Sequence, residues 1–573
     1  MTALELLAPA RSADIGIAAI DCGADAVYIA GPAYGARKDA GNSLEEVGRL
    51  CRYAHRFGVR IFLTVNISLK DEELPAVHEM MLAAQREGVD AFIIRDERIC
   101  LWDDIDRPLH ASTQCEIRGP ERAARFEALG CSRVVLERQL SLDRIKEIRS
   151  AISCEIEAFV HGALCVCYSG DCRLSQALSD RSADRGECIQ ACRSLYDLVD
   201  EKGRVLVKNK ALLSLKDLNL LPRLSSLAEA GVSSFKIEGR LKNASYVKNV
   251  VREYSLALDA LVAANPEKYR RSSFGKVRGG FEPDSRKTFN RDYTALFLDG
   301  RRGRWSSMDT AGSLGEFVGT VDALGKDFVR IKPSRTGLNL RNGDGFAFAA
   351  KDGESGFRAD VVEGNTLHCR RPEGLRPGDR LYRNFSAFFE KEMEHNSCKR
   401  EISVGLKVKI DRQGVEISAR SEDGREVFLR DAQQFPPARN SERILSMLGS
   451  GLQKSSGSYR FEIESIEKGE VLPLISSSYI NSLRSGLAKK LDDLPPVALP
   501  LPAGKRKGEV TVEEPSRRNY LMLSKYCIKY ELGLCPKYNG AKPTGRLYLL
   551  NNSRRFALGF DCAHCEMSVI LEN

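Results

Sequence analysis

Eight short apolar runs in the first 260 residues constrain the fold of this chain more than any other feature. The runs are LELLAP (4–9), AVYIA (26–30), IFLTVN (61–66), AFIIRD (91–96), LHASTQ (109–114), RVVL (133–136), IEAFVHG (156–162) and SFKIEGR (234–240). Most are rich in Val, Ile, Leu or Phe, as strands buried on both faces should be. Amphipathic stretches that end in Gly lie between them, for example residues 43–58 and 74–88. Eight strands alternating with helices over about 250 residues predict an α/β fold, a TIM-like (β/α) barrel.

An open, doubly wound sheet is the alternative to the barrel. The barrel is favoured because no Gly-rich phosphate-binding fingerprint follows the first run. In a barrel, polar residues at the C-terminal ends of the strands face the mouth, where active sites of this fold lie. Eight residues occupy such positions: Asn66, Asp96, His110, Gln114, Glu137, His161, Glu238 and Arg240. Their convergence from several strands predicts a functional site at the mouth.

The predicted barrel covers residues 1–260, and changes in sequence pattern divide the rest of the chain into further predicted domains. Residues 261–400 alternate apolar and polar positions with Gly-Asp turns, which predicts a β-rich, barrel-like domain of a kind common in RNA-binding proteins. Residues 401–490 combine a hairpin pattern with helical segments and predict an α+β domain. Residues 491–520 form a Pro-rich and then basic linker, and residues 521–573 a separate four-cysteine module.

Seventeen cysteines need an explanation in this chain. It shows no signal-peptide pattern and no apolar run of the roughly 20 residues that span a bilayer, which predicts a cytoplasmic protein without a membrane partner. Disulfides are disfavoured there, so clustered cysteines indicate metal or redox chemistry. Nine of them fall in two groups, 165–192 and 527–565. The net charge of +9 permits an RNA partner without requiring one.

The first group has the spacing C-x6-C-x15-C-x3-C on Cys165, Cys172, Cys188 and Cys192. It follows the seventh apolar run, so we expect it at the barrel mouth. Four thiolates from separate turns suit an iron–sulfur cluster, and nearby glycines suit loops that bring backbone amides to the sulfurs. A four-cysteine zinc site stays open, although zinc sites usually use paired short knuckles. We interpret Cys167 as a bystander, because adjacent residues in an extended turn point in different directions.

The second group comprises Cys527, Cys535, Cys562 and Cys565. Its C-x7-C and C-x2-C layout predicts a structural zinc in a module too small to fold alone. Basic and aromatic residues surround it: Lys525, Tyr526, Lys529, Tyr530, Lys537, Tyr538, Arg554 and Arg555. This composition predicts contact with RNA, and a solvated basic surface is the alternative.

Three segments, EAFVHGALCVCYSGDCRLSQ, SADRGECIQACR and FKIEGRLKNASYVKNV, resemble the collagenase-like peptidase family U32. The likeness begins at LELLAPA and runs through the barrel. It implies an iron–sulfur hydroxylase of RNA or of a quinone precursor, with a 4Fe–4S cluster on Cys165, Cys172, Cys188 and Cys192. The segments GADAVYIAGPAYGAR, LHASTQCEIR and KYCIKYELGLCPK with FDCAHCEM are similar to the members that form 5-hydroxycytidine in 23S ribosomal RNA. For those members hydroxylation is linked to prephenate, which the resemblance implies here as co-substrate.

This resemblance leads to a hypothesis about the mouth of the barrel. A flipped-out pyrimidine would lie beside the cluster. His161, Glu238 and Arg240 are the leading candidates for acid–base and anion contacts, followed by Lys236 and Asp96. Arginine and lysine side chains there could hold the two carboxylates of prephenate. An electron-donor protein is a further expected partner.

Three other functions stay open from the sequence. They are 5-hydroxylation of the wobble uridine in transfer RNA, a metallo-peptidase or collagenase-like hydrolase, and a noncatalytic RNA-binding factor. The sequence contains no GxSxG, HExxH or Walker A pattern, so it shows no hydrolytic nucleophile. This counts against the peptidase.

Overall fold

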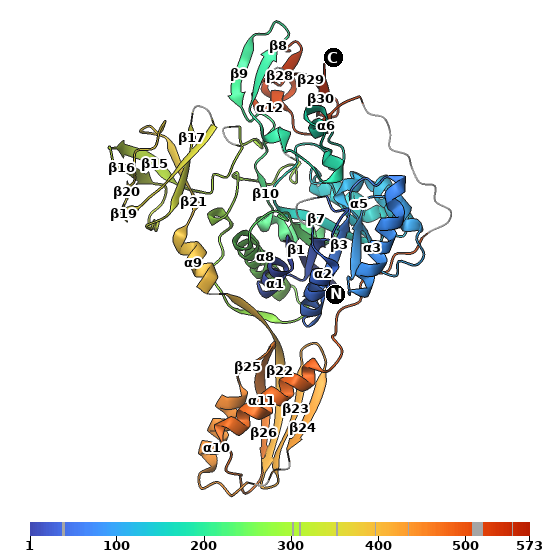
Figure 1. Cartoon of the computed structure of the whole chain (residues 1–573), viewed down its shortest axis with the longest axis vertical. Helices are drawn as coiled ribbons and strands as arrows, with labels where there is room; N and C mark the ends of the chain where they lie inside the picture. Colours follow the sequence, from blue (N-terminus) through green and yellow to red (C-terminus); the bar gives the residue numbers. More distant parts are fainter. Residues whose placement is uncertain are drawn as a thin grey trace.

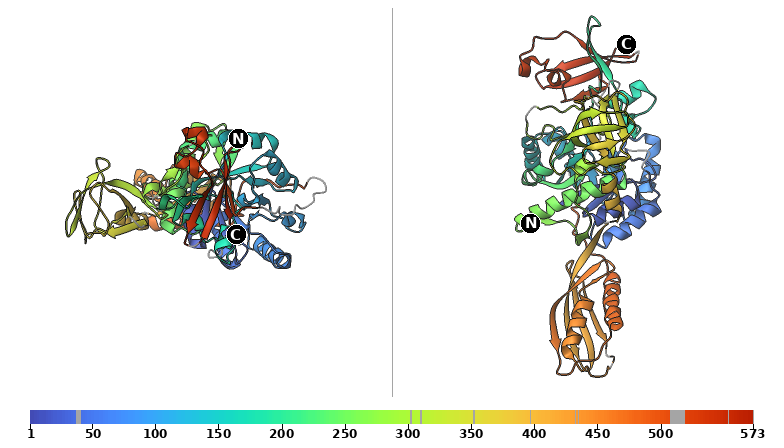
Figure 2. Two further views of the ribbon diagram at one scale, coloured as in Figure 1. Left: turned by 90° about the horizontal axis from the view of Figure 1, so that it is seen from above. Right: turned by 90° about the vertical axis from the view of Figure 1, so that its left-hand side faces the viewer.

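Four β-sheets organise the described part of the chain (Figure 1). The structure is a computed structural model that describes residues 1–572 except 37–40, 301–302, 309–310, 351–352, 396, 432, 434, 507–518 and 553. Figure 2 shows two of the sheets at opposite ends of the long axis, with the barrel between them. Within the described residues, no helix combines the length and apolar character needed to cross a membrane.

Eight parallel strands close into a barrel in the first 240 residues. They are β1 (Thr2–Ala10), β2 (Ala26–Ala30), β3 (Arg60–Val65), β4 (Ala91–Ile94), β5 (Leu109–Ala111), β6 (Arg133–Val135), β7 (Glu155–Gly162) and β11 (Val232–Ile237). Neighbours in this order pair, β11 pairs with β1, and the parallel pairing of β7 with β11 closes the ring. The predicted barrel is therefore confirmed, and each of the eight apolar runs overlaps one of its strands.

Seven helices surround the barrel (Figure 1). They are α1 (Ala13–Asp21), α2 (Leu44–His55), α3 (Leu74–Arg86), α4 (Pro120–Ala128), α5 (Leu142–Ala151), α7 (Leu224–Glu229) and α8 (Ala244–Ala264). The side chains of Ser43 and Ser141 accept a backbone N–H from the first turn of α2 and α5, which stabilises the start of each helix. Gly88 and Gly130 follow α3 and α4 with φ of 98° and 96°. This left-handed conformation lets the chain turn toward the next strand.

The segment between β7 and β11 leaves the barrel and carries the first cysteine group. We call residues 163–231 the excursion. It contains α6 (Leu174–Leu178), β8 (Tyr196–Asp200), β9 (Val205–Lys210) and β10 (Asp217–Asn219). Because β10 pairs antiparallel with His161 and Gly162 at the end of β7, the excursion lies at the C-terminal side of the barrel.

The C-terminal residues and the excursion share one sheet. Its order is β27 (Met522–Ser524), β30 (Glu566–Leu571), β29 (Arg554–Asp561), β28 (Leu547–Asn551), β8 and β9, with the short helices α12 (Ile528–Glu531) and α13 (Pro536–Asn539). Met522 and Tyr526 belong to the same hydrophobic core as the barrel. The sequence indicates a separate module here, and the structure instead joins this tail to the barrel. The pairing of β28 with β8 links distant segments, so no local pattern reports it.

A seven-stranded antiparallel sheet has a hydrophobic core of its own, which includes Val318, Phe346 and Leu381. Its strands are β15 (Glu316–Leu324), β16 (Phe328–Pro333), β17 (Gly345–Ala350), β18 (Gly353–Arg358), β19 (Val361–Glu363), β20 (Thr366–His368) and β21 (Arg380–Phe385). The helix α9 (Ala387–His395) follows it. The sheet lies within the range that the sequence assigns to a β-rich domain.

The remaining sheet lies at the end of the molecule opposite the tail (Figure 2). It contains β13 (Lys276–Gly279), β22 (Cys398–Asp411), β23 (Gly414–Ser421), β24 (Glu426–Asp431), β25 (Ser455–Ser456) and β26 (Tyr459–Lys468), and it packs against α10 (Ser441–Leu452) and α11 (Ser477–Asp492). Two short strands, β12 (Tyr269–Arg271) and β14 (Tyr293–Thr294), extend the barrel sheet by pairing with β1 and β10.

The Pro-rich part of the predicted linker crosses the N-terminal side of the barrel. Arg60, the first residue of β3, donates a hydrogen bond to the carbonyl of Leu499. Leu501 packs against the cluster inside the barrel that contains Phe62. The described part of this segment is thus held against the barrel, whereas the predicted basic part at 507–518 lies outside the described residues.

Candidate functional site

A pocket opens at the C-terminal ends of the barrel strands and encloses about 980 Å³ of empty space, its open mouth included. The barrel strands contribute Tyr28, Thr64, Phe159 and Lys236, and the segments that follow the strands contribute Asn66, Ser112, Thr113, Gln114, Arg138, Glu238 and Arg240. The excursion contributes Cys165, Cys167, Ser169, Cys172, Asp184, Cys188 and Cys192, among others. Four of the eight strand-end residues named from the sequence line this pocket: Asn66, Gln114, Glu238 and Arg240.

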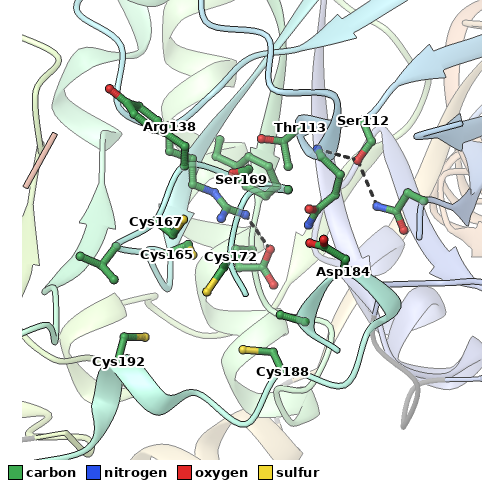
Figure 3. A pocket seen from close by; sticks show the side chains of 18 of the residues that line it. Ser112, Thr113, Arg138, Cys165, Cys167, Ser169, Cys172, Asp184, Cys188 and Cys192 are labelled. Atoms are coloured by element: carbon green, nitrogen blue, oxygen red, sulfur yellow. Dashed lines mark hydrogen bonds and ion pairs between the residues drawn. The ribbon is translucent and has the colours of Figure 1, made fainter. Parts of the chain in front are cut away.

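The four cysteines of the first group come from separate turns of the excursion. Cys165 follows β7 and Cys172 precedes α6. Cys188 lies between two 3-10 turns, η5 (Ala183–Arg185) and η6 (Ala191–Arg193), and Cys192 lies in the second. All four line the pocket, and Figure 3 shows their sulfur atoms around a common space.

Burial and mutual proximity shape the chemistry of these thiols. Burial raises the pKa of Cys165, and the nearby sulfurs of Cys172, Cys192 and Cys188 raise it further. Burial also raises the pKa of Cys192, to about 11. Several thiolates held together away from water repel one another, so they need a positively charged partner to exist as thiolates. The group is therefore suited to bind a metal or a metal cluster.

Cys167 also lines the pocket, and its side chain is completely buried. A hydrogen bond with Cys167 lowers the pKa of Cys172. Cys167 is thus a direct neighbour of one of the four cysteines. Its interpretation as a bystander stays a prediction.

No three His, Cys, Asp or Glu side chains in the described ranges come close enough together to hold a single metal ion. Tetrahedral zinc with Zn–S bonds of about 2.3 Å needs sulfurs about 3.8 Å apart.

The second cysteine group is not assembled into the predicted zinc site. Cys527 and Cys535 are the residues that begin α12 and α13, and Cys562 and Cys565 lie in the turn between β29 and β30. Each is fixed by its own short element, and no three of them reach one ion in this part of the described chain. The predicted zinc ligation stays a prediction.

Three cationic side chains line the pocket, together with the carboxylates Glu238 and Asp184. Arg138 forms an ion pair with Glu238 at 3.0 Å between nitrogen and oxygen. Its guanidinium carbon lies 3.8 Å from the centroid of the Phe159 ring. Arg138 is thus held both by charge and by stacking, and its position between β6 and β7 is well defined.

Lys236 and Arg240 are the other two cations, and both are sequence-predicted site residues. The ammonium of Lys236 donates to Glu157 at 2.6 Å, and burial lowers the pKa of this lysine. Arg240 donates to the hydroxyl of Thr64 at 3.0 Å. The structure thus brings Glu238, Lys236 and Arg240 together in one pocket.

The other two predicted catalytic residues, His161 and Asp96, do not line this pocket. The His161 ring is 1% exposed, and the rings of Tyr254 in α8 and Tyr293 in β14 enclose it with centroids 5.4 Å away. Neither of its ring nitrogens has a hydrogen-bond partner, and burial lowers its pKa to about 3. Asp96 begins η3 (Glu97–Leu101) and pairs with Arg98 at 2.7 Å. Their predicted catalytic roles have no support in this geometry.

Two further strand-end residues, His110 and Glu137, contact other parts of the protein rather than the pocket. His110 lies inside the barrel with its ring 4.8 Å from that of Phe62. Glu137 accepts backbone N–H groups from Arg138 and from Ser169, each at 2.7 Å. Burial raises the pKa of Glu137. Because Ser169 lies between two of the cysteines, Glu137 fixes the cysteine-bearing excursion to the end of β6.

Sequence reasoning missed several pocket residues. Thr64 and Ser112 stand in the same strand-end segments as predicted residues, so the positional argument could have included them. Asp184 is harder to find because it lies in η5 of the excursion, 3.5 Å from Arg95. Burial raises the pKa of Asp184. Its only signal in the sequence is its place between two predicted ligand cysteines.

The tail contributes one edge of the pocket. Met522 lines it, and the backbone N–H of Tyr168 donates to the carbonyl of Leu523 at 3.0 Å. The Tyr168 hydroxyl donates to Glu566 at 2.7 Å. Tyr526 is completely buried, so the prediction that its ring contacts RNA is wrong. The aromatic residue serves the core that joins tail and barrel.

Comparison with known proteins identifies a matching family and several similar proteins. The model of peptidase family U32 matches residues 11–307. The 23S rRNA 5-hydroxycytidine C2501 synthase of Escherichia coli is 35% identical over an alignment that covers 99% of this chain and 94% of that protein. The tRNA hydroxylation protein P1 of Bacillus subtilis is 34% identical and covers 52% of this chain and 72% of its own length. A collagenase of Porphyromonas gingivalis is 29% identical over 66% of this chain and 97% of that protein.

Proposed function

Since this chain belongs to peptidase family U32, we propose that it is an RNA-modifying hydroxylase with its active site in the cysteine-lined pocket. The observation that carries the proposal is the gathering of Cys165, Cys172, Cys188 and Cys192 around a space that the strand-end residues also line. The relative that aligns with almost the whole chain is named for synthesis of 5-hydroxycytidine in 23S rRNA. We therefore propose 5-hydroxycytidine in 23S ribosomal RNA as the product.

The four cysteines would hold a 4Fe–4S cluster. Such a cluster, when bound, supplies one-electron redox chemistry. The C-x6-C-x15-C-x3-C spacing, which lacks the paired short knuckles usual for zinc, supports a cluster over a single zinc ion. The backbone N–H of Gln190 donates to the Cys188 sulfur at 3.4 Å, a contact of the kind that tunes cluster potentials. Electrons would come from a donor protein.

Amide and hydroxyl groups on one side of the pocket would hold the nucleobase. Asn66 donates to the Ser112 hydroxyl at 3.1 Å and accepts from the backbone of Ala36 at 3.0 Å, so its orientation is fixed. Gln114 adds a second amide. A side-chain amide carries both hydrogen-bond donors and an acceptor. It can therefore match the edge of cytosine, which also presents donor and acceptor groups. The cytidine has to leave the RNA stack to reach these groups, which costs a few kcal/mol.

The cations of the pocket would hold the carboxylates of prephenate as co-substrate. Arg138 and Lys236 already have the carboxylate partners Glu238 and Glu157. An incoming carboxylate would therefore share Arg138 with Glu238 rather than meet a bare cation.

Asp184 is the pocket carboxylate best suited to hold or move a proton at the base. Burial raises its pKa, so it binds a proton closer to neutral pH than an exposed aspartate does. We assign it this role in place of His161 and Asp96. Glu238 is the less suitable group, because its ion pair with Arg138 favours the charged form.

Nucleoside mass spectrometry of 23S ribosomal RNA tests the proposed function. RNA from a strain that lacks the gene should lose 5-hydroxycytidine, and the wild-type gene should restore it. The Cys188→Ala variant should not restore it. An unchanged nucleoside profile after deletion would overturn the proposal.

A second candidate is 5-hydroxylation of the wobble uridine in transfer RNA. It is favoured by the match of 52% of this chain to a tRNA hydroxylation protein. The same strains decide between the two, because this candidate predicts loss of 5-hydroxyuridine from transfer RNA instead. Peptide cleavage by the iron-free protein would support a hydrolase.

A further inference from the structure

The β15–β21 sheet carries an aromatic pair, the exposed Phe317 and the half-buried Tyr382, on the face away from its own core. Phe317 of β15 stands opposite Tyr382 of β21, and their ring centroids are 5.4 Å apart. Phe317 is 36% exposed, although its neighbour Val318 is buried in the core of the sheet. On β21, Leu381 is likewise buried beside Tyr382. Because side chains alternate along a strand, both rings lie on the outer face.

Three basic side chains lie on the same face. The guanidinium carbon of Arg380 is 4.4 Å from the centroid of Phe317. Arg380 and Lys332 both pair with Thr320, so they occupy one row across β21, β15 and β16. Arg330 lies two residues from Lys332 on β16, and all three basic residues are exposed. We call Phe317, Tyr382, Arg380, Lys332 and Arg330 the outer patch.

The composition of the outer patch distinguishes between classes of partner. An apolar protein surface would leave the three charges without compensation, whereas a polyanion would neutralise them. Aromatic faces stack with any base, and a stacked arginine adds a cation–π contribution. The exposed carboxylate Asp322 on β15 reduces the positive charge and does not cancel it.

We propose that the outer patch is a docking platform for a single-stranded segment of the RNA substrate. Bases stack on Phe317 and Tyr382, and Arg380 and Lys332 contact backbone phosphates. This inference rests on the proposed RNA function, because it assumes that the substrate is RNA. It adds a binding surface far from the chemistry, on a sheet with its own core.

The position of the sheet explains what a second contact adds. Figure 1 shows it standing beside the barrel, apart from the strand ends that form the pocket. An RNA held at both places binds more tightly than at either alone, because the second contact becomes intramolecular. The pocket then selects the nucleotide, and the outer patch supplies affinity that depends little on sequence.

Titration of the full chain with a fluorescein-labelled, unstructured RNA oligonucleotide tests the platform. The Kd should rise about tenfold for each ring removed, in Phe317→Ala and Tyr382→Ala and their double variant. Arg380→Gln and Lys332→Gln should each lower the slope of log Kd against log salt by about one. Phe428→Ala is the matched control, because Phe428 is 56% exposed on β24 of a different sheet. It should leave the Kd unchanged.

The outcomes separate the platform from the proposed function. An unchanged Kd in the double variant, with an unchanged melting temperature, overturns the platform even if the RNA is still hydroxylated. An equal loss in Phe428→Ala also overturns it, because binding would then follow any exposed ring. If the wild-type chain binds the oligonucleotide through the patch and modifies no RNA, the platform stands and the hydroxylase proposal falls. If the patch variants bind the RNA oligonucleotide as the wild type does but no longer bind a ribosomal protein, the patch binds a protein partner. This result overturns the RNA platform.

Discussion

The two cysteine groups offer the same number of sulfur atoms, and their surroundings differ. In the excursion, four cysteines from separate turns line one pocket at the barrel mouth. In the tail, Cys527 and Cys535 begin two short helices, and Cys562 and Cys565 lie in a hairpin turn. The first group thus lines a pocket, whereas the second lies at the starts of two short helices and in a turn.

The difference lies in what holds the main chain around the sulfurs. Glu137 binds the backbone of Ser169 inside the excursion. Arg193 donates to the carbonyl of Leu164 at 2.9 Å and to the hydroxyl of Ser214 at 2.8 Å, which joins both ends of the cysteine segment. Buried, charge-assisted hydrogen bonds of this kind fix turns in place. The tail buries Tyr526, Tyr548 and Phe556 but leaves Tyr538 exposed, and each group has one exposed cysteine, Cys188 and Cys562.

Removing one sulfur from each group is the strongest test of this contrast. Cys188→Ala should abolish the brown chromophore and lower hydroxylated product by about 100-fold or more, because one of four proposed cluster ligands is lost. Cys562→Ala should retain iron, chromophore and product. Iron analysis of protein purified without oxygen and nucleoside mass spectrometry measure both. Equal loss in the two variants would contradict the contrast.

A second test removes the Glu137 hydrogen bonds that hold the excursion and leaves every cysteine in place. Glu137→Ala leaves the buried N–H groups of Ser169 and Arg138 without their carboxylate, and we expect it to lower the free energy of unfolding by about 3 kcal/mol. It should also lower the iron content. Glu566→Gln in the tail is the matched control, with a smaller loss and normal iron. Urea unfolding gives the free energies, and iron retention in Glu137→Ala would show that the excursion is held by other contacts.

The buried His161 predicts a pH dependence that the tail lacks. Burial lowers its pKa from 6.5 to about 3, so below pH 6.5 the unfolded chain binds a proton that the folded chain does not. Stability then falls with decreasing pH by about 1.4 kcal/mol per unit, down to the folded pKa. His161→Phe should remove this contribution, seen by urea unfolding between pH 7 and pH 5. Parallel pH profiles for wild type and variant would contradict it.

His564 in the tail is the control for this pH experiment. It is exposed, and a hydrogen bond with Asp561 raises its pKa. Its contribution to stability has the opposite sign, since it is present below the unfolded pKa and lost as pH rises through the folded one. His564→Gln should therefore leave the acid-side loss of stability in place.

The smallest expected effect concerns the contact between the two regions. Tyr168→Phe removes the hydroxyl that binds Glu566 and should lower the free energy of unfolding by about 1 kcal/mol. Iron content should stay normal, because the backbone bond from Tyr168 to Leu523 remains. Thermal unfolding of the full chain measures the change. Loss of the cluster in this variant would show that the tail takes part in holding the excursion.

The strands of the barrel and the order of its elements were predictable from the sequence alone. A strand buried on both faces must be apolar along its length, and helices around it must be amphipathic, so both leave local patterns. The position of the first cysteine group after the seventh strand also followed, because chain order in a barrel sets which end a loop occupies. Glu238 and Arg240 were found by the same argument.

Only the tertiary structure decided which of the polar residues reach the pocket. His161 was excluded because tyrosines from α8 and β14, distant in sequence, enclose its ring. Asp184 was included because η5 lies at the pocket, and the tail joined the excursion through the pairing of β28 with β8. Burial and long-range pairing depend on segments far apart in the chain, and a local pattern carries no record of them.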